Sequence, residues 1–134
     1  KPLANRVEAG KRPRSSMSPV MVFNKDGSLR LVVGSPGGSR IIDYVAQVVV
    51  GVLDWNLDAQ EAINLPRITN RNNYTSLEKG TELANHKAEF VNRGHNVRIL
   101  DLNSGLHAVE LKEGKLYGAA DPRREGIALS DKSH

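Results

Sequence analysis

An apolar strand that passes through a glycine-rich turn into an apolar helix constrains this fold more than any other feature. Residues 29–55 read LRLVVGSPGGSRIIDYVAQVVVGVLDW. Leu29–Ser35 predicts a buried strand, and Arg40–Asp54 predicts a helix that Ser39 caps. The expected apolar stripe of this helix comprises Ile41, Val45, Val48, Val49, Val52 and Leu53. Strand and helix must therefore pack on one core, with only a short turn between them.

Two hairpins are expected on either side of this unit. Ser18–Asn24 is expected to pair with the strand Leu29–Ser35 through the turn signal Asp26-Gly27. His107–Asp121 is expected to fold back on itself at Glu113-Gly114. The other expected elements are a helix Ala59–Asn64 begun at Asp58, a short strand near Tyr74–Glu78, a helix from the cap Thr81 to Asn92, and a strand His95–Leu102. Helices grouped between antiparallel hairpins predict a layered α+β fold, not a doubly wound parallel sheet.

Composition narrows the class of protein. The 134 residues carry 19 Lys and Arg against 15 Asp and Glu, a net charge of +4, with no cysteine. Disulfides, cysteine-ligated zinc and cysteine nucleophiles are thereby excluded, and none of the histidines is paired at metal-ligand spacing. Basic residues gather near the N-terminus without aromatic partners, so we expect a solvated segment and no nucleic-acid partner. We expect one domain over 1–134, with a loop segment at 1–14 and a polar tail at 124–134.

The turn Gly34–Arg40 is the first candidate site. Its spacing fits neither a phosphate-binding Walker loop nor a Gly-x-Ser-x-Gly nucleophile elbow. Two adjacent glycines leave backbone N–H groups unshielded just before a helix, which suits a carboxylate, a phosphate or a developing oxyanion. A tight turn that only needs positive φ explains the same residues. The pattern leaves both interpretations open.

Two further segments are dense in polar side chains. Arg14–Pro19 reads RSSMSP, whose hydroxyls could hold a substrate carboxylate or could bond to the local backbone. Ala120–Gly126 reads ADPRREG, for which a structural clamp between aspartate and arginine is the expected role.

Four segments resemble the gamma-glutamyltranspeptidase family. They are GKRPRSSMSPVMVFNKDGSLRLVVGSPGGSRII (Gly10–Ile42), EAINLPRI (Glu61–Ile68), RGHNV (Arg93–Val97) and YGAADPRREG (Tyr117–Gly126). The resemblance implies part of an N-terminal-nucleophile hydrolase with an α-β-β-α sandwich, made as a precursor that cleaves itself into two subunits. In that family the new N-terminal Thr of the small subunit attacks a γ-glutamyl amide such as glutathione. The acyl group then passes to water, an amino acid or a dipeptide, with no metal or cofactor.

The resemblance also assigns residues. Gly37 and Gly38 match the oxyanion hole, Ser15 and Ser16 match the pair that holds the donor's α-carboxylate, and Met17 lines the same pocket. The family's nucleophilic Thr has no match in this sequence, so the large subunit and the remaining part of the small subunit are expected partners. A periplasmic or extracellular bacterial location is expected. A related glutaryl or cephalosporin-type acylase and a non-catalytic anion-binding module are the alternatives.

Overall fold

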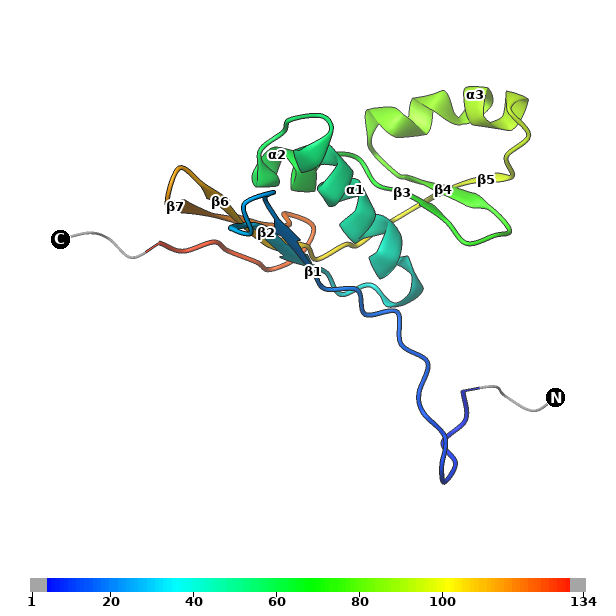
Figure 1. Ribbon diagram of the computed structural model, residues 1–134. Helices are drawn as coiled ribbons and strands as arrows, with labels where there is room; N and C mark the ends of the chain where they lie inside the picture. The colour runs from blue at the N-terminus through cyan, green and yellow to red at the C-terminus, as the bar shows by residue number, and fades with distance from the viewer. Residues whose placement is uncertain (1–4, 131–134) are drawn as a thin grey trace.

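The computed structural model describes residues 5–130, which form two β-sheets joined by helices (Figure 1). The elements are, in chain order, β1 (Val20–Phe23), β2 (Leu29–Gly34), the 3-10 helix η1 (Gly38–Arg40), α1 (Ile41–Leu53), α2 (Ala59–Asn64), β3 (Ile68–Asn70), β4 (Thr75–Glu78), the 3-10 helix η2 (Glu82–His86), α3 (Lys87–Asn92), β5 (Val97–Leu100), β6 (His107–Lys112) and β7 (Lys115–Ala120). The expected loop segment and tail are described only in part: residues 5–14 and 124–130 contain no helix or strand, and residues 1–4 and 131–134 lie outside the described chain.

The first sheet has the order β1-β2-β6-β7 and is antiparallel throughout. Both predicted hairpins are confirmed, with Asp26-Gly27 joining β1 to β2 and Glu113-Gly114 joining β6 to β7. The register aligns one residue from each strand across the sheet: Val20, Val33, Ala108 and Ala119. These four side chains therefore point to the same face, toward the core.

Helix α1 fills the core above this sheet. Tyr44, Val48 and Val52 on α1 are at most 2% exposed and belong to one cluster with Leu31 and Val33 of β2. The predicted stripe is confirmed except at Leu53, which is 37% exposed.

The start of α1 differs from the prediction. Ser39 does not cap it, because residues Gly38–Arg40 already form a 3-10 turn and Arg40 occupies the N-cap position without a side-chain bond. Helix α2 does begin at Asp58 as expected. Its carboxylate accepts from the Glu61 N–H at 2.7 Å, while Glu61 accepts from the Asp58 N–H at 2.9 Å.

The second sheet has the order β3-β4-β5. Sequence reasoning expected β4 and β5 but missed β3, and the pairing of β4 with β5 is parallel. Their connection contains η2 and α3, so the single helix expected after Thr81 starts as a 3-10 helix. Thr81 bonds backward, donating its hydroxyl to the Glu78 carbonyl at 2.8 Å, and caps no N–H group.

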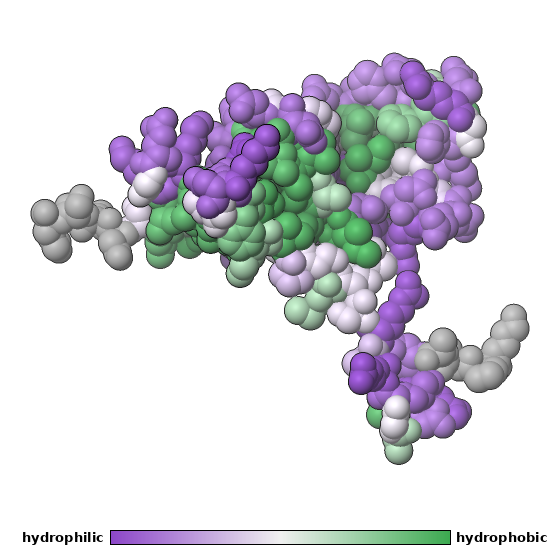
Figure 2. Space-filling model, viewed as in Figure 1, coloured by the Kyte–Doolittle hydropathy of each residue, from purple (hydrophilic) through white to green (hydrophobic). Residues whose placement is uncertain are grey.

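The layers match the predicted α+β class. Helices α1 and α2 pack on one face of the first sheet, and Figure 2 shows hydrophobic residues gathered over β1, β2 and α1. The opposite face carries Met21 and Val109, which are 65% and 39% exposed. Within the described residues, no helix is long and apolar enough to cross a bilayer.

Candidate functional site

One end of the first sheet collects the segments that the sequence singled out. Val20 begins β1 opposite Val33, so residues 15–19 leave the sheet at the end where β2 runs into the turn Gly34–Arg40. Gly34 pairs with His107 at the start of β6, and His107 pairs with Ala120 at the end of β7. Residues 103–106 and 121–126 therefore emerge at the same end. Figure 1 shows the blue segment before β1 and the cyan turn after β2 leaving the sheet at this end.

The backbone of the turn has two residues in conformations that favour glycine. Gly37 has φ 142° and Gly38 has φ 59°. A Cβ on Gly37 would lie 2.9 Å from Tyr44 Cε2, whereas a Cβ on Gly38 would meet nothing within 4 Å. The requirement for positive φ is therefore confirmed at both positions, and the space beside Gly38 is open.

The N–H groups of these glycines are unused. The Arg40 N–H donates to the Gly37 carbonyl at 3.3 Å and the Ile41 N–H donates to the Gly38 carbonyl. Neither the Gly37 nor the Gly38 N–H donates a hydrogen bond to any of residues 5–130. Two adjacent donors that have no partner in residues 5–130, just before the 13-residue helix α1, can bind an anion.

The serine segment makes local bonds. Ser15 Oγ accepts from the Met17 N–H at 3.2 Å, and Ser18 Oγ donates to the Ser16 carbonyl at 3.0 Å. Ser15 is exposed, Ser16 is half-buried and Met17 is 77% exposed. Among the described residues no hydrogen bond joins this segment to Gly37 or Gly38. The strand register brings the two segments to one end of the sheet, and their assigned roles stay predictions.

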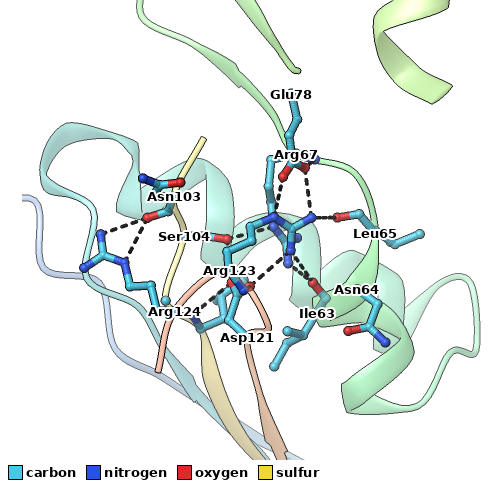
Figure 3. A network of polar contacts seen from close by, with 12 residues as sticks. Ile63, Asn64, Leu65, Arg67, Glu78, Asn103, Ser104, Asp121, Arg123 and Arg124 are labelled. Atoms are coloured by element: carbon cyan, nitrogen blue, oxygen red, sulfur yellow. Dashed lines mark hydrogen bonds and ion pairs between the residues drawn. The ribbon is translucent and has the colours of Figure 1, made fainter. Parts of the chain in front are cut away.

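A buried ionic network lies beside the turn (Figure 3). Arg67 is fully buried, and its guanidinium donates to Gln47 Oε1 at 3.2 Å, to Ser104 Oγ at 3.1 Å and to the Ile63 carbonyl. Burial lowers the pKa of Arg67 to about 10. Arg67 is charged at neutral pH because this pKa still lies well above 7.

The remaining charges of the network come from Glu78, Asp121 and Arg123. Arg123 donates to the two Glu78 carboxylate oxygens at 2.5 and 2.8 Å and to Asp121 Oδ1 at 3.1 Å. Burial by itself raises the pKa of Asp121, but hydrogen bonds from Ser104, Arg123 and the Leu106 N–H outweigh it and hold that pKa below its ordinary value. We call Arg67, Glu78, Asp121 and Arg123 the clamp.

The clamp confirms one prediction and extends it. The pairing of Asp121 with Arg123 was expected from the sequence ADPRREG, whereas Arg67 and Glu78 were missed. The only local signal for Arg67 was an arginine directly after Leu65-Pro66, where α2 has ended. Across residues 5–130, no group of three or more acidic or histidine side chains is arranged to hold a metal ion.

Comparisons with known proteins place these features in context. The family model for gamma-glutamyltranspeptidase matches residues 1–130. The glutathione hydrolase proenzyme of Escherichia coli K12 is 42% identical over 123 residues, which are 90% of this chain and 21% of that protein. An acylase ACY 1 proenzyme of Pseudomonas sp. strain SE83 is 33% identical over 92% of this chain and 22% of that protein. The chain thus spans about a fifth of the length of these relatives.

A solved structure agrees with the sequence comparison. A mutant of Helicobacter pylori gamma-glutamyltranspeptidase superimposes with a TM-score of 0.80 at 37% identity, covering 90% of this chain and 68% of that chain. Fold, sequence and family model coincide over nearly all of the described residues. This chain belongs to the gamma-glutamyltranspeptidase family.

Proposed function

We propose that the protein transfers or hydrolyses γ-glutamyl groups, and that this chain supplies the oxyanion hole. The observation that carries the proposal is that the N–H groups of Gly37 and Gly38 donate to none of residues 5–130. When a nucleophile adds to the amide carbonyl of the donor, the carbonyl oxygen becomes negatively charged. Preorganised N–H donors stabilise that charge more than they stabilise the ground-state carbonyl.

The nucleophile in this proposal is an N-terminal Thr that this chain does not carry. Its hydroxyl attacks the γ-carbonyl carbon while its own α-amino group takes the proton, and that proton then passes to the leaving amine. The resulting acyl-enzyme ester is attacked by water, an amino acid or a dipeptide. Gly37 and Gly38 stabilise the oxyanion in both steps, and no residue of this chain changes its covalent bonds.

Ser15, Ser16 and Met17 form the donor-binding part of the proposal. Ser15 Oγ accepts from the Met17 N–H through a lone pair, so its hydroxyl proton stays available to donate to a carboxylate. The Ser16 hydroxyl makes no hydrogen bond with the part of the chain that the structure describes. Two hydroxyl donors before β1 suit the α-carboxylate of a γ-glutamyl group, and the exposed Met17 side chain supplies an apolar wall.

The open face of the first sheet supports the proposed partners. Phe23 and Leu116 are 57% and 70% exposed, adding to the apolar side chains of Met21 and Val109. Sheets pack face to face through such side chains. We propose that the large subunit and the remaining part of the small subunit cover this face, completing an α-β-β-α sandwich. We also propose a periplasmic or extracellular location for the assembled enzyme.

The acylase relative favours a second candidate function. A glutaryl group differs from a γ-glutamyl group only by lacking the α-amino group, so both acyl groups suit an oxyanion hole with a carboxylate site. A pair of donors that differ only in this amino group therefore separates the two functions. A non-catalytic anion-binding module would bind phosphate or glutamate and turn over neither donor.

The test measures release of the aromatic amine from γ-glutamyl anilide and from glutaryl anilide by the full-length protein. We expect the γ-glutamyl donor to be preferred and an added dipeptide to accelerate release. Preference for the glutaryl donor would assign the protein to the acylases, and no release from either donor would contradict both enzyme assignments. Ser16→Ala should raise KM for the donor with little change in kcat, while Ser28→Ala, in the hairpin turn, should leave both unchanged.

A further inference from the structure

We infer that Ser35 is a positioning residue for the oxyanion hole; the inference rests on the proposed function. Ser35 follows β2 and lies two residues before Gly37. Its hydroxyl donates to the Pro36 carbonyl at 2.6 Å and accepts from the Gly105 N–H at 3.3 Å. A single side chain therefore ties the turn to Gly105, which is 70 positions away in the sequence and lies within residues 103–106.

The bond to Pro36 acts on the peptide unit that carries the catalytic donor. The Pro36 carbonyl and the Gly37 N–H belong to the same peptide plane, and no cis peptide bond occurs in the part of the chain that the structure describes. In a trans peptide these two groups point in opposite directions. Fixing the carbonyl therefore fixes the direction of the Gly37 N–H. A hydrogen bond accepted by the carbonyl also polarises the N–H of the same peptide and strengthens it as a donor.

Residues 103–106, which Ser35 contacts through Gly105, are themselves held in place by hydrogen bonds. Within residues 103–106, the Ser104 hydroxyl donates to Asp121 at 2.5 Å, and the Asn103 carbonyl accepts two bonds from Arg124 at 2.8 and 3.1 Å (Figure 3). Gly105 fits tightly, because a Cβ there would lie 2.7 Å from both Pro36 Cγ and Arg124 Cδ. The clamp thus holds residues 103–106, and these hold the turn through Ser35.

The test compares Ser35→Ala with Ser35→Thr in the full-length protein, using the γ-glutamyl anilide assay. Ser35→Ala removes the hydroxyl but leaves both glycines and the donor-binding serines in place. We expect kcat to fall roughly tenfold, with KM for the donor within about twofold of the parent, because the transition-state oxyanion is affected and the ground state is not. Ser35→Thr, which keeps a hydroxyl, should recover most of the lost kcat.

Two further variants make the result decisive. Gly105→Ala should lower kcat as well, since its methyl group displaces Pro36. Ser28→Ala removes a hydroxyl that also donates at 2.6 Å, to Asp26 in the hairpin turn at the other end of the sheet, and should leave kcat unchanged.

An unchanged kcat in Ser35→Ala, a rise in KM alone, or loss of folding in Ser35→Ala would each overturn the positioning role. Those outcomes leave the proposed function intact provided that the parent protein turns over the donor. Failure of the parent protein itself to release amine would instead contradict the proposed function.

Discussion

The turn Gly34–Arg40 and the clamp both contact residues 103–106, and they use their polar groups in opposite ways. In the clamp, Arg67 and Arg123 direct their guanidinium groups at carboxylates, a hydroxyl, an amide oxygen and backbone carbonyls, and two positive charges face two negative ones. In the turn, the Gly37 and Gly38 N–H groups have no partner within residues 5–130. Internal satisfaction stabilises the fold, whereas donors left open are available to a ligand.

The difference also separates the expected effects of substitution. A change in the clamp leaves buried charges without partners, so it should reduce the free energy of unfolding. A change beside the open donors should reduce catalysis more than stability. Three experiments test this contrast.

The largest effect is expected from Arg67→Ala. The substitution removes a buried cation and leaves Ser104, Gln47 and the Ile63 carbonyl without their donor. Breaking a buried ionic network in this way costs about 3–5 kcal/mol of unfolding free energy. Urea denaturation followed by circular dichroism measures it. Arg71→Ala, at an exposed position, serves as the matched control, and its unfolding free energy should stay within about 0.5 kcal/mol of the parent value. Equal losses in both variants would contradict a special stabilising role of the clamp.

A smaller and pH-dependent effect is expected from Asp121→Asn. The pKa of Asp121 is lowered in the folded protein, so its charged form stabilises the fold at every pH above the ordinary carboxyl value of 3.8. We expect the substitution to cost about 2 kcal/mol at pH 7, the scale of a lost charged hydrogen bond. As pH falls below 3.8 the parent loses this contribution and the two proteins should converge. Unfolding titrations at pH 7 and in acid measure the gap, and a constant gap would contradict the assignment.

The smallest effect on stability is expected from Gly38→Ala, compared with Gly114→Ala. Both glycines have positive φ, 59° and 74°, and neither has an atom within 4 Å of a Cβ position. Each substitution should therefore cost about 1–2 kcal/mol of stability through backbone strain. Only Gly38→Ala puts a methyl group beside the proposed oxyanion, so it alone should lower kcat. We expect a fall of at least about tenfold, compared with the 10²–10³-fold fall in kcat that removing one oxyanion-hole donor usually causes. Similar kcat values in the two variants would remove Gly38 from the site.

Local signals explain which elements were predictable. The Asp58 cap, both hairpin turns and the stripe of α1 each depend on residues within a few positions. Each is confirmed, except that Leu53 of the stripe is exposed. Strand β3 was missed because Ile68–Asn70 has only three residues and gains its identity from pairing with β4. The Ser39 cap failed for a related reason: the glycines before it begin a 3-10 turn that displaces the helix start.

The same distinction between local signals and long-range contacts applies to the candidate site. The sequence by itself determined that a bare Gly-Gly turn joins a buried strand to a buried helix, because periodicity and glycine content are local properties. Tertiary structure decided what surrounds the turn. It brought Tyr44 under Gly37, residues 103–106 against Ser35, and Glu78 between two arginines. The contacts of Ser35 with Gly105 and of Glu78 with Arg123 join residues 70 and 45 positions apart, and only strand pairing and core packing bring such residues together.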